Sequence, residues 1–305
     1  LVKIAAVLIG YIKRIYQLFI IKKFDGIYIF LYCVPFTNIF FERLIIKFAR
    51  KTIYDIDDLV FLLKTSKENW IASYLKSSEK YFYLMKKSDY VITCTPYLNQ
   101  IAKKHNSKTI DISSTVNTEK YYLKNFKNDN QQLVIGWSGS YSTGPYLKLI
   151  EDVIQDLVPR YNLKLLVIGA KKKYIRGIEY ELIPWKAETE VEDLQKIDIG
   201  LYPLPNEEWV YGKSGLKAIQ FMALGIPVVA SAIGANYRVI DHGVNGFLAE
   251  NNNEWKNFIK ILSNNHSKRK VMGKNAREKV IEKFSVKANR SIYLKIFDKT
   301  FKNIY

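Results

Sequence analysis

The chain has 305 residues, about twice the size of a typical domain, which predicts two domains and excludes one small disulfide-stapled domain. Hydrophobic residues make up 48% and charged residues 25% of the chain, a composition that excludes an intrinsically disordered or collagen-like protein. Lys and Arg number 47 against 29 Asp and Glu, a net charge of +18. This charge favours an anionic partner: nucleic acid, a lipid head group or a phosphorylated substrate.

The first hundred residues contain both cysteines, Cys33 and Cys94, each inside an apolar run. We expect them to be core residues in a reducing compartment, without a disulfide framework or zinc cluster. The apolar runs at 4–12 and 27–36 are shorter than the roughly 20 residues of a membrane span. No transmembrane helix or cleavable signal peptide is predicted. Because the chain begins with Leu inside a helical pattern, we expect a strand and a loop to precede it.

The first part of the chain alternates short apolar runs with longer amphipathic stretches, which is typical of βαβ units. Strands are predicted at 26–34, 51–54, 90–94 and 109–112. Helices are predicted at 39–50, 66–87 and 97–105. The polar segment 117–132 lacks apolar periodicity and is predicted to be a domain linker.

A second alternation follows the linker. Strands are predicted at 133–137, 163–168, 178–183, 197–202 and 227–231. Helices are predicted near 144–157, 191–196 and 215–224, and after Phe247 at 255–262, at 267–284 and from about 285 to the end. Open α/β sheets bind ligands at the carboxyl ends of their strands. The cleft between two such domains is therefore the expected active site.

The segment 211–231, YGKSGLKAIQFMALGIPVVAS, predicts a helix followed by a buried strand. The serine and glycine at 214–215 stand at the expected N-cap, where free backbone N–H groups attract phosphate. Lys213 lies beside this end, and Lys217 and Gln220 follow on one helical face. The pattern suits a diphosphate at the helix start and a hydroxylated ring further along. Solvated lysines beside an ordinary serine cap are an equally good interpretation of the spacing.

Two glycine-containing stretches resemble phosphate loops. Gly212, Lys213 and Ser214 copy the end of a Walker A motif, but Glu207 stands where the motif requires glycine, which excludes a P-loop NTPase. The run GWSGSYSTG at 136–144 follows a predicted strand and opens a predicted helix. Such a loop lets the backbone approach a phosphate or sugar closely, and an ordinary strand-to-helix turn is the alternative.

The run GKSGLKAIQFMALGIPVVASAIGANYRVIDHGVNGFLA, preceded by DIGLYPLP, resembles the C-terminal domain of retaining GT-B glycosyltransferases of the family 4 type, glycosyl transferases group 1. The resemblance continues through IGWSGSYSTGPYL and, more weakly, YVITCTPYLNQIAKKHNSKTIDISSTVNT. It implies an α/β fold, GT-B, with two Rossmann-like domains facing across a cleft and C-terminal helices packing back toward the N-terminal domain. The implied parts are an acceptor-side domain at 1–125, incomplete at its start, a nucleotide-sugar-binding domain at 126–284, and a returning helix at 285–305.

The resemblance also implies roles for individual residues. The family's paired glutamates are absent, because the first falls on Gly212 and the second, which holds the nucleotide ribose, falls on Gln220. An amide can still bind a ribose hydroxyl. Trp185 falls near the family's base site, although a core position is the favoured interpretation. The predicted substrate-binding residues are Gly139, Ser140, Ser214, Gly215, Leu216, Lys217, Gln220 and Asp58.

The stretch YDIDDLVF places Asp55, Asp57 and Asp58 at the end of a predicted strand. Mutual repulsion among these acids is expected to raise at least one pKa. In the resemblance Asp57 takes the place of a histidine that touches the donor sugar, so Asp57 and Lys213 are the predicted catalytic residues. Acids that merely cap the next helix are the alternative. An Asp-x-Asp metal site belongs to a different glycosyltransferase fold, and no metal ligand is predicted.

The predicted function is transfer of a sugar from a nucleotide-diphosphate donor to an acceptor hydroxyl, with retention implied by the family, in glycan, glycolipid or polysaccharide assembly. Lys213 and the helix start are expected to stabilise the leaving diphosphate without a metal or other cofactor. The expected acceptor is a carbohydrate or lipid-linked molecule.

The basic, aromatic helix around 12–23 predicts docking on an anionic membrane surface, which implies a cytoplasmic protein that is peripheral at the inner face of the membrane. No nucleic-acid-binding motif accompanies the positive charge, so no nucleic-acid partner is expected. The alternative function is a catalytically silent sugar-nucleotide-binding protein.

Overall fold

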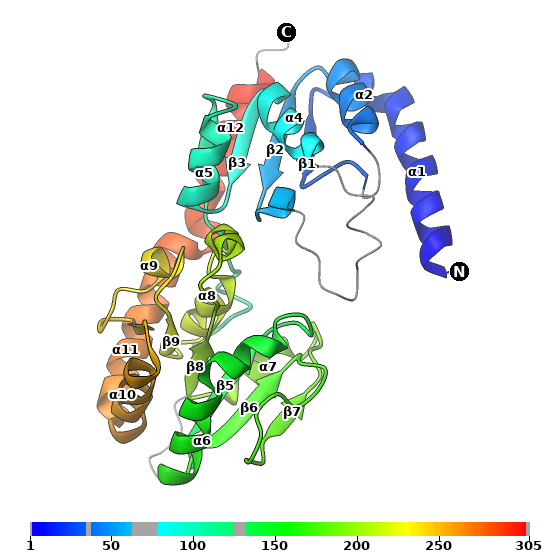
Figure 1. The fold of residues 1–305 in the computed structure, drawn as a ribbon. Helices are drawn as coiled ribbons and strands as arrows, with labels where there is room; N and C mark the ends of the chain where they lie inside the picture. Colours follow the sequence, from blue (N-terminus) through cyan, green and yellow to red (C-terminus); the bar gives the residue numbers. More distant parts are fainter. Residues whose placement is uncertain (1, 35–37, 63–77, 125–131, 303–305) are drawn as a thin grey trace. The chain divides into compact units, whose positions relative to one another are not determined.

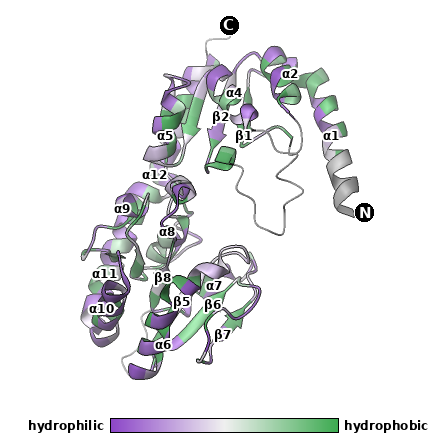
Figure 2. Cartoon of the chain, viewed as in Figure 1, coloured by the Kyte–Doolittle hydropathy of each residue, from purple (hydrophilic) through white to green (hydrophobic). Residues whose placement is uncertain are grey.

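The computed structural model describes residues 2–34, 38–62, 78–124 and 132–302. The chain forms two units (Figure 1): unit 1 comprises 1–113, 211–213 and 290–305, and unit 2 comprises 114–210 and 214–289. The first division falls before the linker that was expected at 117–132. Hydrophobic residues concentrate in strands such as β6, whereas α10 and α11 are largely hydrophilic (Figure 2).

Unit 1 contains a parallel sheet with the strand order β1-β2-β3-β4. Its strands are β1 (Ile27–Phe30), β2 (Thr52–Ile56), β3 (Tyr90–Thr93) and β4 (Thr109–Asp111). Its helices are α1 (Val2–Ile20), α2 (Phe40–Phe48), α4 (Glu79–Lys87), α5 (Pro96–Lys103) and the part of α12 (Val286–Phe301) from Arg290 onward. The four strands predicted here are confirmed. Of the helix predicted at 66–87, residues 66–77 lie outside the described part of the chain.

Helices cover both faces of this sheet because successive strand residues point to opposite sides. Ile53 and Ile92 face α12, where they pack with Ile296. Tyr54 and Val91 face α2, α4 and α5 in a separate core cluster. The two faces of the sheet therefore pack against different sets of helices.

Unit 2 contains a parallel sheet with the strand order β10-β9-β8-β5-β6-β7. Its strands are β5 (Val134–Ser138), β6 (Lys164–Ile168), β7 (Glu181–Ile183), β8 (Ile199–Tyr202), β9 (Val228–Ser231) and β10 (Gly246–Ala249). Its helices are α6 (Glu151–Arg160), α7 (Glu190–Gln195), α8 (Leu216–Ala223), α9 (Asn236–Val239), α10 (Asn252–Asn264) and α11 (His266–Lys279). The strand order reverses between β5 and β8, the switch point at which open α/β sheets bind ligands. The expected α/β class with two Rossmann-like domains is confirmed.

Unit 2 departs from the predicted elements in several places, among them β10 and the segment before α6. Strand β10 was not predicted, because its sequence GFLA has no β-branched residue; pairing of Phe247 with Val229 of β9 holds it in the sheet. The segment Gly144–Ile150, expected to be the start of a helix, is a 3-10 helix that precedes α6. Pro145 lies in its first turn and has no backbone N–H to donate.

The segment that follows Ser113 packs into unit 2 through polar contacts. The backbone of Val116 pairs with the chain at 284–286. Lys124 is 3% exposed, and its Nζ donates to the carbonyl of Ile197 at 2.6 Å and to Asp198 Oδ1 at 2.5 Å. Lys124, one of the polar residues that predicted a linker, therefore satisfies buried groups of unit 2.

We predict that Lys124→Met will lower the free energy of unfolding by about 3–5 kcal/mol, because it leaves the Asp198 carboxylate without its buried partner. Chemical denaturation measures this change. Lys120→Met, at an exposed position four residues earlier, should change stability by less than about 0.5 kcal/mol. Equal effects of the two substitutions on the free energy of unfolding would show that the buried pair of Lys124 and Asp198 does not stabilise the packing of this segment.

Candidate functional site

Close backbone packing brings two loops together at the carboxyl edge of the unit 2 sheet. The amide of Gly139, directly after β5, donates to the carbonyl of Ile168 at 3.1 Å. Gly169, after β6, has a φ of +85°, and a Cβ there would collide with the Gly139 carbonyl oxygen. Glycine is therefore required at 169. Ser140 lies exposed in the loop after β5, so the structure places the predicted Gly139 and Ser140 at a strand end as expected.

The start of α8 has no capping side chain among the described residues. Gly215 is the N-cap, with a φ of +79°, and its carbonyl accepts the first intrahelical bond from Ile219 at 3.0 Å. The N–H groups of Leu216, Lys217 and Ala218 therefore have no carbonyl acceptor within the helix. Ser214 does not cap the helix, which corrects the ordinary-cap interpretation; its Oγ is hydrogen-bonded to Ser114 Oγ at 2.6 Å. Leu216 is partly open to solvent.

Further along α8, Gln220 belongs to a network of buried polar side chains. The Gln220 amide nitrogen donates to Tyr121 Oη at 2.6 Å and to Glu190 Oε1 at 3.1 Å. Tyr121 donates to Glu190 Oε2 at 2.5 Å, and Lys217 Nζ donates to Gln220 Oε1 at 2.8 Å. Lys217 Nζ also lies 3.8 Å from Glu190 Oε1. The predicted pair Lys217 and Gln220 is thus joined by two groups from other segments.

This network fixes the orientation of the Gln220 amide. A lysine ammonium can only donate and an ionised carboxylate can only accept. The amide oxygen must therefore face Lys217, and the amide nitrogen must face Glu190. Gln220 retains a second lone pair on Oε1 for a hydrogen bond from a ligand hydroxyl.

Trp185 is held at the edge of the same network. Its indole Nε1 donates to Glu190 Oε1 at 2.9 Å, while its side chain is 47% exposed. The interpretation of Trp185 as a core residue is therefore wrong. Its N–H is satisfied inside unit 2, and much of its ring reaches solvent.

Hydrogen bonds determine the charge of Glu190. Burial alone would raise its pKa, but donation by Tyr121 and Trp185 outweighs burial and lowers the pKa. Burial lowers the pKa of Lys217, and the charge of Glu190 opposes this. The network consequently holds an ionised carboxylate beside a partly buried lysine.

Sequence reasoning missed Glu190 and Tyr121. They are separated from Gln220 by 30 and 99 residues, and their contacts depend on how α7 and the segment at 114–124 pack. Glu190 lies among other acids in ETEVEDL, so nothing in the local pattern distinguishes it.

In unit 1, the predicted residues Asp58 and Lys213 meet although 155 residues separate them. They form an ion pair between Lys213 Nζ and Asp58 Oδ2. Asp58 Oδ1 also accepts from the amide of Leu59 at 2.8 Å, so the alternative of an acid that caps the following turn holds for this residue in part. A Cβ at Gly212 would lie 2.6 Å from Leu59 Cγ, so glycine permits the close approach that brings Lys213 to Asp58.

The other two acids of this cluster differ in environment. Asp55 is buried in β2 and accepts from Tyr28 Oη. Burial raises the pKa of Asp55 to about 6, and Asp57 adds a smaller contribution. The pKa of Asp57 is raised by burial and then by Asp58. The expected pKa increase is present, but burial rather than mutual repulsion is its main cause. The catalytic role of Asp57 stays a prediction.

We predict that Asp55→Asn will gain stability relative to the wild type as the pH rises. A carboxyl whose folded pKa lies near 6, against 3.8 unfolded, contributes stability below pH 4 that is lost as the pH rises through 6. Between pH 4 and 8 the wild type should lose about 2–3 kcal/mol of unfolding free energy relative to the variant. Denaturation at a series of pH values measures it, with the exposed Asp25→Asn as control. A pH-independent difference would contradict the assignment.

The chain is similar to known glycosyltransferases. A sequence model described as "Glycosyl transferases group 1" matches residues 132–265. An uncharacterized glycosyltransferase of Methanocaldococcus jannaschii is 30% identical over 243 residues, which cover 73% of this chain and 66% of that protein. The chain thus spans about two thirds of the length of this relative.

Solved structures share the fold. A glycosyltransferase from Rickettsia africae has a TM-score of 0.70 at 17% identity, over 97% of this chain and 82% of that chain. Anabaena HepE in complex with UDP and glucose has a TM-score of 0.64 at 17% identity, over 84% of this chain and 74% of that chain. These similarities place residues 132–265 in the family described as "Glycosyl transferases group 1", and with the two parallel sheets described above they show that the chain has the GT-B fold.

Proposed function

We propose that this chain transfers a sugar from a nucleoside-diphosphate donor to an acceptor hydroxyl with retention at the anomeric carbon. The observation that carries the proposal is the uncapped start of α8, followed on the same helix by Lys217 and Gln220 in an oriented polar network. Anabaena HepE, which has the same fold, binds UDP and glucose. The proposed setting is glycan, glycolipid or polysaccharide assembly, with a carbohydrate or lipid-linked acceptor.

In this proposal the diphosphate accepts hydrogen bonds from the N–H groups of Leu216 and Lys217 and from Lys213 Nζ. Such donors stabilise the charge that develops on the departing diphosphate. Lys213 can take part while it remains paired with Asp58, because an ammonium group has three donors. A cation and fixed N–H dipoles supply the charge stabilisation, so we propose a reaction that needs no metal.

The other predicted residues are assigned to the sugars. Lys217 and Gln220 Oε1 face the hydroxyl groups of the ribose, and the loop with Gly139 and Ser140 approaches the donor through its backbone. Asp57 accepts a hydrogen bond from a hydroxyl of the transferred sugar. In the free protein the Asp57 carboxylate makes no side-chain hydrogen bond to another described residue, which supports this role.

Two measurements test this function. Thermal shift with UDP, GDP, ADP and CDP should raise the unfolding midpoint for at least one of them by mass action, and inorganic phosphate should not reproduce the shift. Sugar transfer from the matching nucleotide sugar should persist in EDTA. Lys213→Ala should reduce turnover by about a hundredfold, whereas the exposed Lys120→Ala should leave it unchanged.

Two outcomes would decide against the proposal. Full turnover in Lys213→Ala would remove the diphosphate assignment. Nucleotide binding without turnover, across carbohydrate and lipid-linked acceptors, would favour the alternative of a silent sugar-nucleotide-binding protein.

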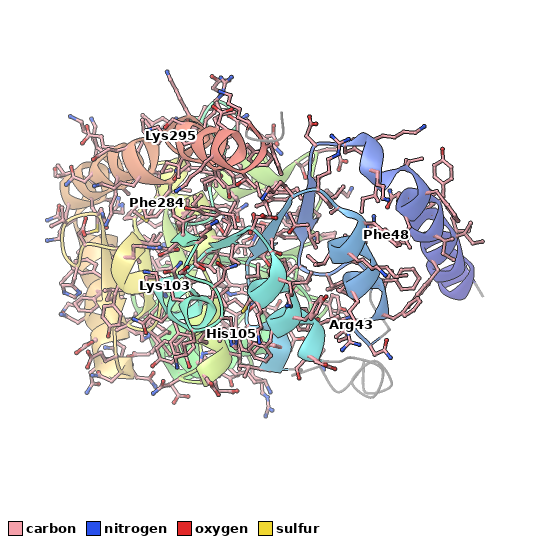
Figure 3. All side chains as sticks on the ribbon, turned by 90° about the horizontal axis from the view of Figure 1, so that it is seen from above. Arg43, Phe48, Lys103, His105, Phe284 and Lys295 are labelled. Atoms are coloured by element: carbon pink, nitrogen blue, oxygen red, sulfur yellow. The ribbon has the colours of Figure 1, made fainter. Side chains whose placement is uncertain are left out.

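We also propose that α1 docks on an anionic membrane surface. One side of α1 packs on α2, where Tyr11 and Phe41 have ring centroids 5.6 Å apart. Figure 3 shows α1 beside α2, which carries Phe48. The opposite side exposes large apolar residues at helical spacing, up to 80% for Phe19. These residues, the α1 stripe, are Ile9, Ile12, Ile15, Tyr16 and Phe19.

The charge around the α1 stripe fits the same partner. Residues 1–24 contain five cations and no acid. Lys22 and Lys23 follow the stripe directly and are exposed. An apolar helix face flanked by cations is typical of peripheral binding to anionic lipid. Among the helices that the structure describes, none has the length and apolarity needed to cross a membrane.

We predict that the protein will sediment with phosphatidylcholine vesicles that contain phosphatidylglycerol, less so with pure phosphatidylcholine, and less again at high salt. Replacing two stripe residues, Ile12→Glu and Phe19→Glu together, should weaken binding at least about tenfold through lost apolar insertion and added repulsion. Val271→Glu, at an exposed apolar position on α11, is the matched control. Binding that ignores both salt and anionic lipid would refute the docking surface.

A further inference from the structure

We propose that Tyr121 is a positioning residue of the nucleotide-sugar site, because its hydroxyl orients the Gln220 amide and holds the Glu190 carboxylate in place beside Lys217. This inference rests on the proposed function, and it extends the site to a segment that lies outside the glycosyltransferase pattern at 132–265. Tyr121 itself does not contact the donor.

The hydroxyl of Tyr121 occupies the centre of the network. It donates to Glu190 Oε2 at 2.5 Å and accepts from Gln220 Nε2 at 2.6 Å. A tyrosine hydroxyl has one proton, and Tyr121 donates it to Glu190, so the lone pairs of the hydroxyl oxygen are left to accept from Gln220. The same hydroxyl thus sets both the orientation of the amide and the position of the carboxylate.

Tyr121 is the first of several groups that lower the pKa of Glu190 and favour its ionised form. The titratable and charged groups that face it are Tyr121 from the segment at 114–124 and Lys217 from α8, and the neutral Trp185 and Gln220 complete its surroundings. Burial and then Glu190 itself raise the pKa of Tyr121, so the tyrosine keeps its proton at neutral pH. Loss of that proton donor would leave a buried carboxylate with fewer donors, and its pKa would rise.

Arg277 of α11 holds the backbone on which Tyr121 stands. Its guanidinium donates to the backbone carbonyl of Thr118 at 2.8 Å, to the carbonyl of Tyr121 itself and to that of Ala223 at the end of α8. Five donors in a rigid fork suit three carbonyl acceptors. One side chain therefore ties the Tyr121 segment to the helix that carries Gln220 and Lys217, and the hydroxyl is presented at a fixed position.

Packing also holds the tyrosine ring. Tyr121 belongs to the core cluster of unit 2 with Ile219 and Ala223 of α8. Phenylalanine at this position keeps that packing and removes only the hydroxyl. The substitution Tyr121→Phe consequently isolates the polar role from the packing role.

The test compares Tyr121→Phe with Tyr122→Phe, the exposed neighbouring tyrosine, by calorimetric titration with the nucleoside diphosphate that the wild type binds. Tyr121→Phe should raise Kd, and the KM for the sugar donor, about tenfold, with kcat changed by less than about threefold. As the pH is lowered, the variant should begin to lose affinity at a higher pH than the wild type does, because the pKa of Glu190 is higher in the variant. Tyr122→Phe should match the wild type in each respect.

Unchanged affinity and an unchanged pH profile in Tyr121→Phe would overturn the inference, even if its unfolding midpoint fell. Glu190→Gln is the second variant: it should weaken binding similarly and remove the acid limb of the profile. Wild-type affinity in Glu190→Gln would overturn the inference on its own. A wild-type protein that binds no nucleoside diphosphate would refute the proposed function as well, so the two failures are distinguishable.

Discussion

The buried carboxylate of Glu190 is the interaction on which the arrangement of unit 2 around α8 depends. Burying a charge costs several kcal/mol unless it is paired and hydrogen-bonded. Here Tyr121, Trp185 and Gln220 donate to it, and each donor comes from a different segment of the chain. Those segments must therefore be packed together for the carboxylate to remain ionised. The folding of unit 2 and the geometry of its candidate site have a common cause.

The start of α8 is also where the chain changes units. Lys213 belongs to unit 1 and is paired with Asp58 there, whereas Ser214 belongs to unit 2 and is hydrogen-bonded to Ser114. Gly215 follows with a left-handed backbone, and no side chain in the described part of the chain caps the helix start. Lys213 and Ser214 each have a partner more than 90 residues away in sequence. Under the proposed function, both residues lie beside the diphosphate. Within unit 2, Ser214 is therefore held by a long-range hydrogen bond and does not act as a local cap of α8.

The sequence pattern predicted the sheets better than the site. Apolar runs located all four strands of unit 1 and five strands of unit 2, because burial of a strand depends on its own residues. Strand β10 was not predicted, since its residues have weak strand preference and pairing with β9 holds it in place. Spacing along α8 correctly grouped Lys217 with Gln220, because the helix fixes that geometry locally.

The contacts between distant segments could not be predicted from local sequence patterns. Glu190 and Tyr121 reach Gln220 only after α7 and the segment at 114–124 have packed. Ser214 was expected to cap α8, but its hydroxyl bonds to Ser114, which no local rule anticipates. Trp185 was expected in the core, whereas its side chain is 47% exposed and its N–H donates to Glu190. Polar side chains choose among several partners, and their choice depends on tertiary structure.

A crystal structure with a bound nucleoside diphosphate would test the proposed diphosphate site at the start of α8. We expect diphosphate oxygens about 3 Å from the amide nitrogens of Leu216 and Lys217 and from Lys213 Nζ, with the ribose against Gln220. A nucleotide bound elsewhere on the protein, with the start of α8 covered by other protein groups, would contradict it.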